Sequence, residues 1–118
     1  MSLSRLMTSL MNSLLAILEG RDGEATALMD AAYPVREPEI LTYFARHYAH
    51  MGMADQAMNT AKHAQQSGFL CAPQTLKSDP WFSTLRQHSK FKSLLSTSED
   101  LVEEAQSNFV ARAPELKI

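Results

Sequence analysis

The chain has 118 residues, of which 45% are hydrophobic and 20% are charged, and its formal net charge is −2. This length and composition are typical of one folded domain with its own core and exclude an intrinsically disordered chain. Because there is no bulk positive charge, we expect neither nucleic acid nor an anionic membrane as a partner. The single cysteine excludes an internal disulfide and a zinc site built from several cysteines.

Residues 3–18 predict the first helix, which Gly20 ends. Its apolar side chains recur at spacings of three and four residues and form a helical stripe: Leu3, Leu6, Met7, Leu10, Leu14 and Leu18. Arg5 followed by this run superficially resembles a signal peptide, but polar residues interrupt the run and no cleavage-site pattern follows it. The run is also too short and too polar to cross a bilayer. We therefore expect a structural helix and a cytoplasmic protein.

Three more helices follow from the spacing of apolar residues. The second begins after a turn in which Asp22 or Gly23 can cap it, and it ends before Pro34, because proline cannot continue the helical hydrogen bonds. The third and fourth span residues 38–52 and 54–67, and each is closed by a glycine. We expect the following side chains on the inner faces of these three helices: Ala25, Leu28, Met29, Ala32, Leu41, Phe44, Ala45, Tyr48, Ala57, Met58, Ala61 and Ala64.

The tail combines a connector, a short helix and a long helix. Residues 69–78 form the connector, which holds at most one short turn of helix. Asp79 followed by proline predicts the start of the short helix, because aspartate accepts hydrogen bonds at an N-cap and proline suits the first helical position. This helix carries Trp81, which we expect to pack onto the fourth helix. The last helix, capped by Ser89, ends near Arg112. Its apolar face comprises Phe91, Leu94, Leu95, Leu101, Val102, Ala105 and Phe109.

The strongest signal is an internal repeat. The pattern Gly-x3-Glu-Ala at residues 20–25 recurs as Gly-x3-Gln-Ala at residues 52–57, an offset of 32 residues. The third and fourth helices also carry Leu-x2-Phe-Ala-x2-Tyr at residues 41–48 and Ala-x3-Ala-x2-Ala at residues 57–64. These patterns resemble the tetratricopeptide repeat, a helix–turn–helix unit of about 34 residues.

The resemblance divides the chain into repeat-like units at residues 3–34 and 37–68 and a capping region at residues 69–112. It implies an all-α domain over residues 1–112, built from antiparallel helical hairpins, a short tryptophan-bearing helix and a long C-terminal capping helix. Residues 113–118 are expected to be a frayed tail. The patterns of the short helix and the last helix also resemble the C-terminal ends of bacterial tetratricopeptide regions, which are often appended to kinases, cyclases or regulators.

The resemblance implies a non-catalytic module that binds a protein or a peptide. In tetratricopeptide folds the first helices of successive repeats line a concave groove. By family register, the groove positions in the second unit are Glu39, Thr42, Arg46, Ala49 and His50. In that groove Arg46 would pair with a ligand carboxylate and His50 would form a hydrogen bond beside it. The family's clamp for chaperone tails has lysine and asparagine at the positions of Thr42 and Arg46, so we do not expect that ligand class.

The sequence contains no recognisable catalytic or metal-binding motif, so we expect no enzymatic activity, no metal and no cofactor. It has no serine nucleophile elbow, no glycine-rich phosphate loop and no His-Glu-x-x-His helix. His47 and His50 lie three residues apart but lack a third ligand, so we expect ordinary surface or half-buried histidines. We expect Cys71 to be a small buried hydrophobic residue and the methionines to fill the core.

Two alternative roles stay open. The apolar stripe of the first helix favours a homodimerisation module, with Leu6 and Leu10 as interface anchors, and Trp81 is a further candidate anchor. The resemblance of the tail favours a regulatory C-terminal segment of a larger bacterial signalling protein. Under any of these hypotheses, the sequence does not identify the partner protein.

Overall fold

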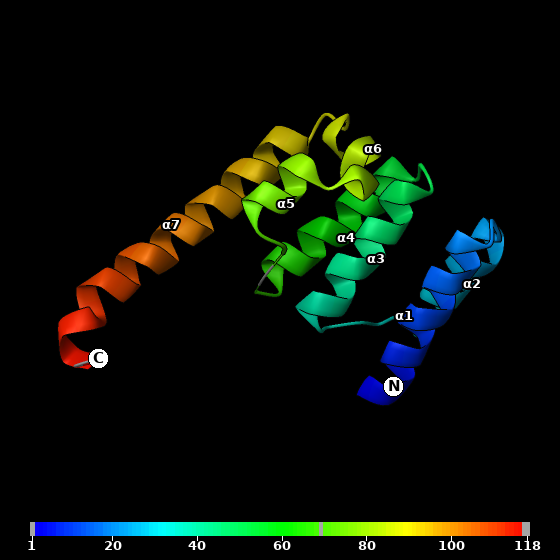
Figure 1. The fold of residues 1–118 in the computed structure, drawn as a ribbon, viewed down its shortest axis with the longest axis horizontal. Coiled ribbons are helices and arrows are strands. Elements are labelled where there is room, and N and C mark those ends of the chain that lie inside the picture. Colours follow the sequence, from blue (N-terminus) through cyan, green and yellow to red (C-terminus); the bar gives the residue numbers. More distant parts are fainter. Residues whose placement is uncertain (1, 69, 117–118) are drawn as a thin grey trace.

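The computed structural model describes residues 2–68 and 70–116, with side chains as far as residue 112, and this part of the chain is helical without a strand (Figure 1). The prediction of an all-α fold is therefore confirmed. In chain order the elements are α1 (Leu3–Leu18), α2 (Asp22–Ala32), α3 (Pro38–His50), α4 (Ala54–Gln66), α5 (Pro73–Ser78), the 3-10 turn η1 (Pro80–Phe82), α6 (Ser83–Arg86) and α7 (Phe91–Leu116).

The repeated Gly-x3-Glu/Gln-Ala pattern corresponds to a repeated turn. Gly20 after α1 and Gly52 after α3 have φ angles of 76° and 79°, in the left-handed region that favours glycine. In both turns the amide of the residue after the glycine donates to the carbonyl four residues before the glycine, at 2.7 Å and 2.9 Å. This is the Schellman arrangement, which satisfies the last carbonyls of a helix. The same local chemistry therefore turns α1 into α2 and α3 into α4.

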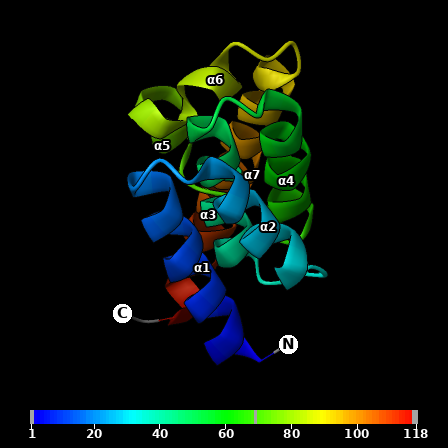
Figure 2. The same cartoon turned by 90° about the vertical axis from the view of Figure 1, so that its right-hand side faces the viewer.

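The two hairpins pack against each other through α1 and α3, and in Figure 2 the α1–α2 hairpin lies in front of the α3–α4 hairpin. Leu6 and Leu10 of α1 belong to the same buried cluster as Phe44 of α3. Within each hairpin the helices approach closely, because the equivalent residues Ala25 and Ala57 are small and fully buried. The expected contact between neighbouring hairpins is thus present.

The predicted inner faces of the second, third and fourth helices are confirmed with one exception: only Leu28 is half-buried rather than buried. Two predicted caps are wrong. Helix α2 already includes Asp22 and Gly23, and Arg21 occupies its cap position. Helix α7 begins at Phe91, one residue too late for Ser89 to be its cap.

The apolar stripe of α1 is wider than the face that the fold buries. The buried residues of α1 are Leu6, Leu10, Ser13, Ala16 and Ile17. Leu3 and Leu18 are exposed, by 60% and 66%. The proposed role of Leu6 and Leu10 as interface anchors is therefore wrong, because their side chains are already buried within the chain.

The capping region covers α3 and α4 through short elements, with Phe82 and Leu85 buried in the core. Asp79 caps η1 as predicted, and its side chain accepts a hydrogen bond from the amide of Trp81 at 3.0 Å. The prediction that Trp81 packs onto the fourth helix is wrong. Its ring stacks on His50 of α3, with ring centres 3.8 Å apart, because η1 lies against α3 and turns Phe82 instead toward the core.

Helix α7 is one continuous helix, as expected, and is longer than predicted. Phe91, Leu94 and Ser98 are buried, whereas every side chain from residue 99 to residue 112 is exposed. Figure 1 shows this second half projecting from the helical body. The helix continues to Leu116, beyond the predicted boundary at Arg112, and residues 117 and 118 of the expected frayed tail lie outside the described residues.

The two Schellman turns make a stability prediction. Gly20→Ala and Gly52→Ala should each lower the free energy of unfolding by about 1–2 kcal/mol, because an L side chain is strained in the left-handed region. Gly23→Ala is the matched control, since Gly23 lies within α2 and a Cβ there would meet nothing within 4 Å. This variant should be as stable as the parent or slightly more stable. Urea unfolding of the three variants is the measurement, and equal midpoints would contradict the assignment of the turns.

Candidate functional site

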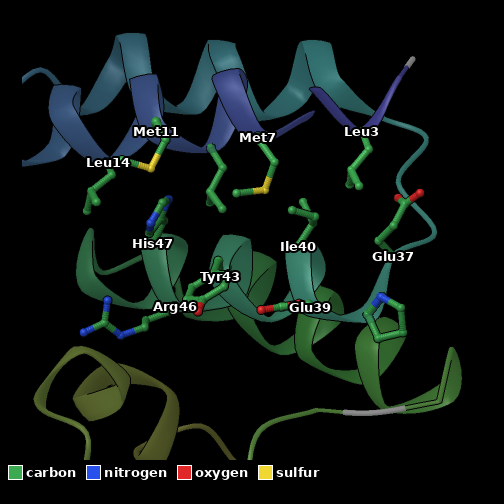
Figure 3. A pocket seen from close by; sticks show the side chains of 12 residues that line it. Leu3, Met7, Met11, Leu14, Glu37, Glu39, Ile40, Tyr43, Arg46 and His47 are labelled. Atoms are coloured by element: carbon green, nitrogen blue, oxygen red, sulfur yellow. The ribbon is translucent and has the colours of Figure 1, made fainter. Parts of the chain in front are cut away.

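The main concave feature lies between α1 and α3, and we call it the α1–α3 groove (Figure 3). Its volume is about 630 Å³. Leu10 and Ile40 are buried at its base, whereas Met7, Met11 and Tyr43 are between 41% and 57% exposed. The complete lining is Leu3, Met7, Leu10, Met11, Leu14, Glu37, Pro38, Glu39, Ile40, Tyr43, Arg46 and His47. α1 thus supplies an apolar wall rich in methionine, and α3 together with its N-cap residue Glu37 supplies the charged groups.

A buried polar pair joins the two helices beneath the groove. Ser13 of α1 and His47 of α3 are 0% and 2% exposed, and Ser13 Oγ lies 3.1 Å from His47 Nδ1. Ser13 also donates its hydroxyl proton to the carbonyl of Leu10, at 2.8 Å. Because a serine hydroxyl has one proton, Nδ1 of His47 must be the donor to Ser13 in this arrangement. The expectation of a surface or half-buried His47 is therefore wrong.

His47 is neutral at pH 7. Burial lowers its pKa to about 4, and the neighbouring Arg46 and His50 side chains act in the same direction. The base of the groove therefore carries no charge, which suits apolar contacts.

A second hollow, of about 390 Å³, lies on the other side of α3 against α5 and η1. Its lining is Glu39, Thr42, Tyr43, Arg46, Cys71, Thr75, Asp79 and Phe82. It shares Glu39, Tyr43 and Arg46 with the α1–α3 groove, so these three side chains form a ridge between the two. Cys71 is half-buried here, and burial raises its pKa to about 11, so it remains a protonated thiol at neutral pH.

Arg46 and His50 are engaged by the capping region. Arg46 Nε donates to the Asp79 carboxylate at 2.8 Å, and the guanidinium carbon lies 4.3 Å from the centre of the Trp81 ring. Trp81 in turn stacks on His50. Burial opposes ionisation of Asp79, but the hydrogen bonds from Arg46 and from the Trp81 amide hold its pKa below the ordinary value. These contacts fasten the capping region to α3.

The structure brings only part of the predicted groove together. Glu39, Thr42 and Arg46 line one or both of the hollows. Ala49 is 1% exposed and reaches no ligand, and His50 lies against Trp81, outside both hollows. The prediction missed Met11 and Tyr43, and it placed Leu3 and Met7 on the apolar stripe of the first helix without assigning them to the groove. One signal in the sequence could have indicated these exposed residues: the first helix has more apolar residues than one buried face can hold.

Comparisons with protein-family models, with curated proteins and with solved structures found no significant match for this chain. Within residues 2–68 and 70–116, no three His, Cys, Asp or Glu side chains are arranged to hold a metal ion. None of the helices in that part of the chain is both long enough and apolar enough to cross a membrane.

The buried His47 makes stability depend on pH. Its pKa of about 4 in the folded state lies below its ordinary value of 6.5, so between these values the unfolded chain binds a proton that the folded chain does not. Stability is therefore fully present above pH 6.5 and falls as the pH drops toward 4. Between pH 7 and pH 5 the expected loss from this residue is about 2 kcal/mol.

The control is His47→Asn, whose side-chain amide can still donate to Ser13 but does not titrate. Urea unfolding of both proteins at pH 7 and pH 5 isolates the contribution of His47, because all other groups are shared. Parallel losses of stability in the two proteins would show that His47 is not a buried neutral histidine.

The ion pair between Arg46 and Asp79 should contribute more to the stability of the fold than an exposed surface pair does. Asp79→Asn keeps an N-cap acceptor but removes the charge, and we expect it to lower the free energy of unfolding by about 1–2 kcal/mol. The control is Glu99→Gln, which breaks the exposed Lys77–Glu99 pair at 3.8 Å and should cost less than about 0.5 kcal/mol. Fluorescence of Trp81, the only tryptophan, reports unfolding. Similar losses in the two variants would contradict the proposed anchoring.

Proposed function

We propose that this chain is a non-catalytic, tetratricopeptide-type module that binds a peptide segment of a partner protein in the α1–α3 groove. The observation that carries the proposal is a row of half-exposed Met7, Met11 and Tyr43 side chains above a buried apolar base. A volume of about 630 Å³ is in the range of ligand-binding sites. Methionine side chains are flexible and adapt to varied apolar partners.

The arrangement of the hairpins supports the same proposal. A tetratricopeptide groove requires the first helices of neighbouring units to stand side by side, and α1 and α3 do so. The identical turns after these helices support a repeat relationship between the two units.

The charges along α3 suggest the chemistry of the peptide. Glu37 lies at one end of the groove, Arg46 lies toward the other end, and Glu39 lies between them, as Figure 3 shows. The hydrogen bond from Arg46 Nε to Asp79 holds the guanidinium group in place. A ligand would therefore meet a positive charge in a fixed position rather than one on a mobile side chain. We expect a peptide with apolar side chains in its centre, a basic residue toward Glu37 and an acidic group toward Arg46.

Selection from a random peptide library, followed by calorimetry with the enriched peptides, tests the proposal. Met11→Lys should weaken binding at least about tenfold, because it places a charge in the apolar wall. Leu15→Lys is the matched control, since Leu15 lies one turn away on α1, is similarly exposed at 50% and does not line the groove. It should leave affinity unchanged. Peptides that bind both variants equally, or a selection that enriches nothing, would count against the α1–α3 groove.

A further inference from the structure

The second half of α7 is an apolar helix face that no other described part of the chain covers. Its exposed apolar side chains are Leu101, Val102, Ala105, Phe109 and Val110. Val102, Ala105 and Phe109 line one shallow hollow, as expected for positions three, four and seven residues apart on one side of a helix. Nearer the start of the helix, Leu94 and Ser98 are buried in the body. The same side of α7 is thus buried in the first half of the helix and exposed in the second half, where the helix extends beyond the body.

We propose that this face binds the same face of a second copy of the chain, with the two α7 helices antiparallel. In a register that sets Val102 opposite Phe109 of the second copy, Leu101 lies opposite Val110 of that copy. Twofold symmetry forms each of these contacts twice. Ala105 then falls near the twofold axis, where its small side chain permits close approach of the helices.

The charges on α7 select the antiparallel orientation. The acidic residues of the exposed half are Glu99, Asp100, Glu103 and Glu104. The rest of the helix, residues 105–116, carries one acidic residue, Glu115, and one basic residue, Arg112, so it has no net charge. Parallel helices would set the acidic halves of both copies side by side, and the like charges would repel. Antiparallel helices set each acidic half beside the half that carries Arg112. The register given above also brings Glu99 opposite Arg112 of the second copy, at both ends of the contact.

A hollow at the base of the projecting helix provides a place for the aromatic ring. It has a volume of about 240 Å³ and is lined by Gly68, Leu70, Cys71, Ser98, Leu101, Val102 and Ala105. Because Phe109 of the second copy lies opposite Val102 in this register, its ring would enter or cover this hollow. The contact spans 14 residues of exposed helix, or about 20 Å, which is short for a stable interface. We therefore expect a weak dimer that dissociates on dilution.

Sedimentation velocity of the full chain from about 1 to 200 µM tests the proposal. The parent protein should shift from monomer to dimer over this range. Phe109→Asp should raise the dissociation constant at least about tenfold, because it places a carboxylate in the apolar contact. Phe109 is 58% exposed and lies beyond the body, so this variant should fold normally, which circular dichroism checks. The matched control Leu15→Asp alters an apolar side chain of similar exposure, 50%, on α1 and should leave the dimer intact.

Charge reversal tests the orientation. Glu99→Arg should weaken the dimer by setting two arginines opposite each other, and combining it with Arg112→Glu should restore most of the affinity. A protein that stays monomeric at 200 µM would overturn the proposal, as would a dimer that survives Phe109→Asp or is lost on Leu15→Asp. A double variant no better than Glu99→Arg alone would overturn the antiparallel pairing. Peptide binding in the α1–α3 groove is measured separately and does not decide this result.

Discussion

The packing of α1 against α3 is the constraint on which the rest of the structure depends. Among the described helices, this is the principal contact that joins the first hairpin to the remainder of the chain. The same contact creates the α1–α3 groove, so stability and the candidate site share one interface. The Ser13–His47 hydrogen bond lies inside it and is fully buried. A buried polar pair of this kind favours one relative position of two helices, because any slip would leave the buried Nδ1–H of His47 without an acceptor.

Helix α3 contacts the first hairpin, its own hairpin partner and the capping region. One side contacts α1, another packs against α4, and its Arg46 and His50 side chains hold Trp81 and the turn at Asp79. The α3 wall of the groove is therefore held in place by α4 and by the capping region, whereas the α1 wall presents flexible methionine side chains. A rigid charged wall facing an adaptable apolar wall is a combination suited to binding peptides that share a charge pattern but differ in apolar sequence.

The sequence was sufficient for the local structure and insufficient for the site. Most helix boundaries and nearly all inner-face residues followed from apolar spacing and from glycine and proline, whose effects act within one turn of the chain. Which apolar residues of α1 stay exposed depends instead on how α1 crosses α3, and that is not a local property. Arg46 was assigned to a ligand by family register. Its partner Asp79 lies 33 residues away, and no local pattern indicated that contact. Ser13 stands 32 residues before Ala45 in the repeat, and nothing in that offset indicated a partner at His47.

The two unpartnered apolar surfaces lie toward opposite ends of the longest dimension of the molecule, with α1 at one end and the tip of α7 at the other (Figure 1). Pairing through α7 therefore leaves the α1–α3 groove of each copy open. Such a dimer presents two grooves joined through the paired α7 helices. Two weak peptide contacts on the same partner assembly then act together, because the first contact raises the effective concentration for the second. The modest size of each groove is thus compatible with tight overall association, provided that the partner also carries two copies of the recognised segment.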